Sequence, residues 1–85
     1  MYKILIDSRV DKDLSKINPP DREIIIKTIN SLASNPRPRG KVKKLKGPLG
    51  GWRVRTGNLR ILYLINDKAK EATIYKVGYR GGVYR

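Results

Sequence analysis

The chain has 85 residues and carries 20 Lys and Arg residues against 7 Asp and Glu residues, a formal net charge of +13 at pH 7. It contains no Cys and no His, which excludes disulfide frameworks, zinc fingers, thiolate nucleophiles and every His-based acid–base scheme. No apolar run approaches the roughly 20 residues of a membrane span, and the N-terminus does not resemble an export signal. We therefore expect one cytoplasmic domain over residues 1–85, without metal or cofactor, whose chemistry relies on Arg, Lys, Tyr, Ser, Thr or carboxylate groups.

The first part of the chain predicts a strand and two helices. Residues 2–6 are β-branched and aromatic, which is typical of a strand. Residues 11–17 space apolar side chains along one side and predict a short helix, which the following prolines end. Asn18 can cap a second helix, whose apolar stripe predicts a span of about residues 20–34.

The remainder of the chain predicts strands joined by turns. A short strand is expected over residues 42–45 and a final one over 73–77. Between them, residues 52–56 and 59–65 flank the two-residue turn Gly57-Asn58, which is a strong hairpin signal. The predicted fold class is α+β: a small antiparallel sheet in β-α-α-β-β-β order, with two N-terminal helices packed on one face.

The charge is distributed unevenly. Residues 1–23 hold five basic and five acidic side chains, whereas residues 24–66 hold ten basic side chains and no acidic one. Like charges held together repel each other, so this asymmetry indicates an anionic partner. Nucleic acid is favoured because Lys and Arg neutralise phosphates; an anionic lipid surface or a merely solvating basic surface are the weaker interpretations.

The hairpin turn fixes which side chains share a face. With Gly57-Asn58 as the loop, Arg55 lies opposite Arg60, and Arg53 joins them on the face opposite the apolar side chains. Two arginines directly opposite each other destabilise a sheet unless something compensates. Because the guanidinium fork matches phosphate oxygens, we interpret this face as a phosphate site. The alternative is a face charged for solubility or to protect an edge.

The C-terminal tail adds an arginine and two tyrosines. Arg80 follows the last predicted strand, and Tyr84 lies close behind it. A tyrosine near cations can assist proton transfer, and the rings of Tyr79 and Tyr84 can also stack on nucleobases. Each ring can equally close the end of the core, which is the commoner role of a lone tyrosine.

These residues together resemble the RelE/ParE superfamily of toxins from toxin–antitoxin pairs, and in particular its RelE branch of messenger-RNA endonucleases. The resemblance covers essentially the whole chain, and no single motif is diagnostic. The matching segments, in chain order, are Val42-Lys43-Lys44-Leu45-Lys46-Gly47, Trp52-Arg53-Val54-Arg55, Leu59-Arg60-Ile61-Leu62-Tyr63, Val77-Gly78-Tyr79-Arg80 and Val83-Tyr84-Arg85.

The resemblance implies a ribosome-dependent endoribonuclease that cuts messenger RNA in the A site, by attack of a ribose 2′-hydroxyl on the adjacent phosphate, and so inhibits translation. It implies an acidic RelB-like antitoxin as partner, contact with DNA only through the antitoxin complex, and no membrane. By motif, the catalytic residues are Arg53, Arg55, Arg60, Arg80 and Tyr84. The remaining basic side chains are expected to bind RNA and to anchor the protein on the ribosome through their charge: Lys41, Lys43, Lys44, Lys46 and Arg85.

Two departures from the family pattern concern the general base. The paired positions Arg53 and Arg55 are often lysine in relatives, and a guanidinium does not deprotonate. Tyr79 stands where relatives often carry histidine or lysine. The identity of the base therefore stays open, as do two other functions: a ParE-like inhibitor of DNA gyrase and a non-catalytic RNA-binding module.

Overall fold

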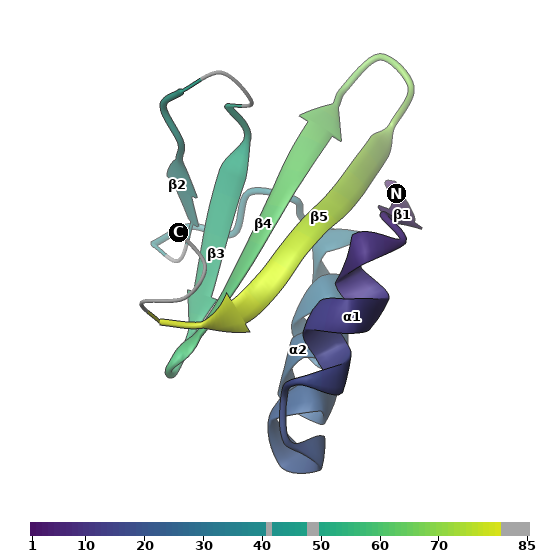
Figure 1. Cartoon of the computed structure of the whole chain (residues 1–85). Coiled ribbons are helices and arrows are strands. Elements are labelled where there is room, and N and C mark those ends of the chain that lie inside the picture. Colours follow the sequence, from purple (N-terminus) through teal and green to yellow (C-terminus); the bar gives the residue numbers. More distant parts are fainter. Residues whose placement is uncertain (41, 48–49, 81–85) are drawn as a thin grey trace.

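The computed structural model describes residues 1–40, 42–47 and 50–80, and Figure 1 shows two helices on one side of a curved sheet. The elements follow in the order β1 (Lys3–Ile6), α1 (Arg9–Ser15), α2 (Pro19–Leu32), β2 (Val42–Lys44), β3 (Trp52–Thr56), β4 (Leu59–Asn66) and β5 (Glu71–Tyr79). The five strands form one sheet in the order β1-β5-β4-β3-β2. The predicted α+β class is confirmed.

Both helices begin at side chains that satisfy free backbone amides. The Asp7 carboxylate accepts a hydrogen bond from the Arg9 amide at 2.9 Å, which starts α1 two residues before the predicted helix. At the start of α2, Asn18 Oδ1 accepts from the Asp21 amide at 3.1 Å, so the predicted cap is confirmed. Within the described ranges, neither helix has the length and apolar character needed to cross a membrane.

The sheet is mixed, which corrects the expectation of a wholly antiparallel one. β1 pairs in parallel with β5, with Lys3 opposite Glu71 and Ile6 opposite Ile74, whereas the other three strand pairs are antiparallel. No tight turn joins β1 to another strand, so local sequence does not determine its direction. The edge of β5 is the position that accepts it.

The core lies between the helices and one face of the sheet. Tyr63 is fully buried there, and its hydroxyl donates to the Pro36 carbonyl at 2.6 Å. Burial raises the pKa of Tyr63, so this hydroxyl stays protonated and structural. The other hydrophobic residues with 0% exposure are Val10, Ile25, Leu32, Ile61, Ala72 and Ile74. The opposite face of the sheet is not covered by the helices.

Candidate active site

The β3–β4 hairpin has the register that its turn predicts. Arg55 lies opposite Arg60 and Val54 opposite Ile61, and Gly57 has the positive φ of +58° that suits the first position of the turn. Val54 and Ile61 face the core, so Arg55 and Arg60 lie on the opposite face, as do residues paired with them. We call this opposite face of β2, β3, β4 and β5 the outer face.

The neighbouring strands extend the row of cations on the outer face. Lys43 of β2 lies opposite Arg53, which adds a second pair of like charges beside Arg55 and Arg60. On the other side Arg60 lies opposite Gly78 of β5, which has no side chain to pack beside that of Arg60. Directly opposed like charges are unfavourable in a sheet, and no acidic residue occurs between positions 24 and 66 to offset them.

The cations of the outer face differ in exposure. The side chains of Arg55 and Arg80 are exposed and that of Arg53 is half-buried, but Arg60 is only 4% exposed. Its Nη1 donates to the Leu59 carbonyl at 3.1 Å, which fixes the guanidinium in place. The hairpin alternation alone places all three hairpin arginines on an open surface, so the burial of Arg60 is a feature that the sequence analysis did not predict.

Two shallow basic pockets lie along β2 and β3 and share Lys43 and Arg53. One, of about 190 Å³, is lined by these two residues with Arg55, Val42 and Gly40. The other, of about 380 Å³, extends along the loop after β2 and is lined by Lys43, Lys44, Leu45, Lys46 and Arg53. Among the described residues, both linings combine cations with no carboxylate, which suits phosphate groups of an extended polyanion.

The last strand brings Arg80 to the same end of the sheet as the hairpin turn. The Arg80 amide donates to the Asn58 carbonyl at 2.9 Å, which ties the residue after β5 to the turn between β3 and β4. The predicted residues Lys41, Tyr84 and Arg85 lie outside the described residues. The outer face thus brings together the predicted residues Lys43, Arg53, Arg55 and Arg60. Arg80 lies at the hairpin end of this face, and Lys44 and Lys46 line the larger of the two pockets.

Tyr79 has the role of closing the end of the core, not the nucleobase-stacking role that was one alternative. Its ring packs against the core, and its hydroxyl accepts from Asn18 Nδ2 at 2.9 Å and donates to Asp21 Oδ2 at 2.8 Å. The hydrogen bond from the Asn18 amide favours the phenolate, but the bond to Asp21 and burial outweigh it and raise the pKa of Tyr79. A neutral, engaged hydroxyl is a poor candidate for the general base.

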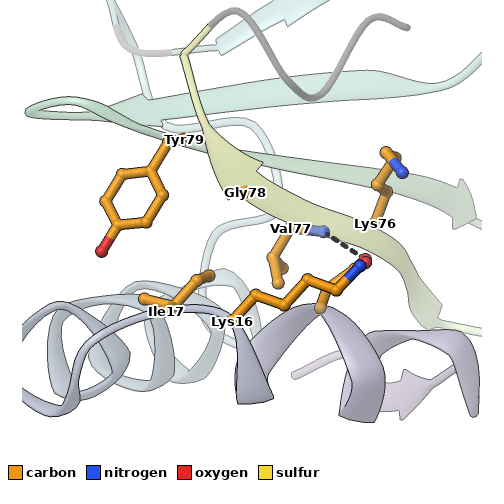
Figure 2. A pocket seen from close by; sticks show the side chains of 7 residues that line it. Lys16, Ile17, Lys76, Val77, Gly78 and Tyr79 are labelled. Atoms are coloured by element: carbon orange, nitrogen blue, oxygen red, sulfur yellow. Dashed lines mark hydrogen bonds between the residues drawn. The ribbon is translucent and has the colours of Figure 1, made fainter.

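Lys76 is a further cation on the outer face that the sequence analysis did not single out. It lies opposite Leu62, which in turn lies opposite Arg53. Figure 2 shows its side chain on the side of β5 away from α1, whereas Val77 points toward the helix. Its place depends on a shift of register between Leu62 and Tyr63, which no local sequence pattern locates.

The sequence matches the model of a known protein family. The family described as "ParE toxin of type II toxin-antitoxin system, parDE" matches residues 4–84. The chain belongs to this family of toxins. Within the RelE/ParE superfamily it falls in the RelE-like branch, which its relatives establish.

One relative is "Putative toxin RelE1" of Methanocaldococcus jannaschii, 33% identical over 86 residues that span 99% of this chain and 96% of the relative. Among solved structures, the RelE–RelB complex of Pyrococcus horikoshii has a chain with 29% identity and a TM-score of 0.81, with coverage of 96% of this chain and 98% of that one. The RelBE2 complex of Mycobacterium tuberculosis has a chain with 26% identity and the same TM-score of 0.81, with coverage of 93% and 98%. A RelE-like toxin therefore carries the outer face described above.

Proposed function

We propose that this RelE-like toxin is a ribosome-dependent endoribonuclease that cleaves messenger RNA in the A site. The observation that carries the proposal is the outer face, where Lys43 opposes Arg53 and Arg55 opposes Arg60 without a neutralising carboxylate in that stretch of sequence. Such an arrangement costs stability in the free protein, and a bound phosphodiester offsets the cost. The RelE-like branch of the chain supports RNA as the source of that phosphodiester.

The proposed reaction is an internal transesterification. The ribose 2′-oxygen attacks the adjacent phosphorus, the bond to the 5′-oxygen breaks, and the products are a 2′,3′-cyclic phosphate and a 5′-hydroxyl. A proton leaves the 2′-hydroxyl and another reaches the departing 5′-oxygen. No metal is needed for this chemistry if fixed cations stabilise the charge on the phosphorane-like transition state.

The proposed roles of the arginines differ with the exposure of their side chains. Arg80 and Arg55, both exposed, contact the scissile phosphate and the RNA backbone, while Arg53 orients the strand at the β2 side. Arg60, held by the Leu59 carbonyl, adds preorganised positive charge, which usually supplies the largest catalytic contribution. Tyr84, which the family motif includes, is the proposed group that assists removal of the 2′-hydroxyl proton.

The lysines anchor the toxin to the ribosome. Lys43, Lys44 and Lys46 line the pocket beyond Arg53, and Lys41 and Arg85 extend the same charge along the sequence. Ribosomal RNA then aligns the 2′-oxygen with the scissile bond, so naked RNA is a poor substrate.

An acidic antitoxin is the proposed protein partner. The two structural relatives above are complexes of RelE with RelB or of RelBE2, and a charge of +13 favours an acidic segment. An apolar groove of about 470 Å³ beside the edge strand β1 includes Ile6, which is 47% exposed, and Ile26, which is 49% exposed. We propose that the antitoxin covers this groove as well as the outer face.

The test is to add purified toxin to ribosomes programmed with a defined message and to map new 5′ ends by primer extension. Cleavage within the A-site codon, with no cleavage of the same message free in solution, is the expected result. A message that stays intact on the ribosome while RNA binding persists would reduce the proposal to the non-catalytic binding module.

Inhibition of DNA gyrase is the second candidate, because the matching family is described as a ParE toxin. It predicts loss of supercoiling activity at toxin concentrations that leave translating ribosomes unaffected. A supercoiling assay beside the primer-extension assay separates the two targets.

A further inference from the structure

β5 extends beyond its parallel partner, and α1 supports its last residues. β1 pairs only with residues 71–74, whereas β5 continues to Tyr79. Along this extension the Val77 amide donates to Asp13 Oδ2 at 3.2 Å, marked by the dashed line in Figure 2. The carboxylate of α1 thus provides an acceptor that a neighbouring strand would otherwise provide.

The end of β5 is attached to the start of α2 through one hydroxyl group. Tyr79 Oη accepts from Asn18 Nδ2 at 2.9 Å and from the Asn18 amide at 3.3 Å, and it donates to Asp21 Oδ2 at 2.8 Å. Asn18 and Asp21 are themselves joined by the cap of α2. We call this set of three residues, Tyr79, Asn18 and Asp21, the Tyr79 latch.

The latch acts on the residue that the proposed function places at the scissile phosphate. Arg80 follows Tyr79 directly, and its amide is also held by the Asn58 carbonyl at 2.9 Å. The backbone at the end of β5 is therefore fixed from two sides, by α2 and by the hairpin turn. Since Gly78 lies opposite Arg60, the same backbone sets the distance between Arg80 and the Arg55–Arg60 pair.

We propose that the Tyr79 hydroxyl is a positioning group, which holds Arg80 in register with the other arginines of the outer face. The catalytic consequence of this inference rests on the proposed function, but the structural claim does not. Packing of the ring on the core needs only a phenyl group, whereas the direction of the β5 end needs the three hydrogen bonds. A misplacement of about 1 Å in a catalytic group can cost about a hundredfold in rate.

The structural claim is tested by amide hydrogen exchange on the folded protein. Tyr79→Phe keeps the ring and removes the hydroxyl, and we expect exchange of the Arg80 amide to accelerate about tenfold, since the backbone before that amide loses one of its two supports. Tyr2→Phe is the matched control: its hydroxyl also donates to a carboxylate, Asp67 Oδ1 at 2.5 Å, but near the opposite end of β5. It should leave exchange at Arg80 unchanged.

The catalytic claim is tested by single-turnover cleavage of ribosome-bound message. Tyr79→Phe should lower the cleavage rate about tenfold, while its affinity for the ribosome and its thermal midpoint stay close to the wild-type values, which a general loss of folding would not produce. Asp21→Asn retains an oxygen that accepts from the Tyr79 hydroxyl, so its rate should stay within about twofold of wild type.

The outcomes separate this inference from the proposed function. If the wild-type protein leaves ribosome-bound message intact, the proposed function is wrong, and the exchange measurement alone decides the latch. Arg80 exchange that is equal in Tyr79→Phe and wild type overturns the structural claim. Faster exchange at Arg80 combined with an undiminished cleavage rate overturns the positioning role.

Discussion

Cations lie at both ends of the sheet, near the β4–β5 turn and near the β3–β4 hairpin turn, but their surroundings differ. Near the β4–β5 turn, Arg37 forms an ion pair with Asp67 at 2.7 Å and lies over the Trp52 ring at 5.2 Å. At the hairpin end, Arg55 faces Arg60 and Arg80 stands exposed beside the turn. Arg37 has its counterion within the fold, whereas under the proposed function the cations of the outer face serve a ligand that arrives from outside.

Removal of Arg80 should produce the largest functional effect. Arg80→Ala is expected to lower the single-turnover cleavage rate of ribosome-bound message about a hundredfold or more, because it removes a cation from the developing charge on the phosphate. Arg9→Ala removes an arginine on α1 that pairs with Asp7 and should leave the rate unchanged. Equal rates for Arg80→Ala and wild type would show that Arg80 does not contact the reacting phosphate.

Stability should respond in opposite directions at the two ends of the sheet. Arg37→Ala loses an ion pair and a cation–π contact and is expected to lower the free energy of unfolding by about 0.5–1 kcal/mol. Arg55→Ala removes one of two opposed like charges and should leave that free energy unchanged or raise it by a few tenths of a kcal/mol, roughly. Urea unfolding of both variants measures the difference, and a clear loss of stability in Arg55→Ala would mean that its charge is already offset within the fold.

Acid should lower stability by protonating the carboxyl groups of Asp67 and Asp7, which are paired with arginines. The Arg37 hydrogen bond lowers the pKa of Asp67 below its ordinary value, and that of Arg9 holds the pKa of Asp7 at about 2. A carboxyl group whose pKa is lower in the folded chain adds stability above its unfolded pKa of about 3.8, and this is lost as pH falls through the folded value. The urea midpoint should therefore fall between about pH 4 and 2.

Asp67→Asn provides the control for this pH dependence. It removes one of the two lowered carboxyl groups, so its urea midpoint should fall less steeply over the same pH interval. An unchanged slope would indicate that the pair between Arg37 and Asp67 contributes nothing to folding.

Single lysine substitutions should have the smallest effect, a change in the salt dependence of ribosome binding. Replacing Lys46 with Gln is expected to reduce the slope of log affinity against log salt by about 1, because one fewer phosphate is neutralised. Lys27→Gln, on the helix side of the protein, is the matched control and should keep the wild-type slope. A slope equal to wild type in the Lys46 variant would remove the loop after β2 from the RNA contact surface.

The sequence predicted those parts of the site that a local rule determines. A two-residue turn fixes the pairing of its strands, so the hairpin register and the Arg55–Arg60 pair were correct in advance. The cap at Asn18 and the class of fold were equally accessible, because both depend on short-range signals. The family resemblance also included both strands of this hairpin.

Features that depend on contacts between distant segments were not predictable. Counted from the turn between β4 and β5, a regular ladder places Val77 opposite Arg60, on the outer face; the bulge between Leu62 and Tyr63 shifts the register by one and reverses the faces. Only then does Lys76 lie on the outer face. The burial of Arg60 and the bonds of Tyr79 to α2 likewise follow from tertiary packing.

Cleavage of ribosome-bound message by Arg55→Ala and Arg37→Ala, measured side by side, tests the contrast between the two ends of the sheet most directly. Arg55 lies on the cationic outer face, and Arg37 forms its ion pair with Asp67 near the β4–β5 turn. We expect cleavage to fall about a hundredfold in Arg55→Ala and to stay at the wild-type rate in folded Arg37→Ala. The opposite pattern, or equal rates in both variants, would contradict the assignment of catalysis to the outer face.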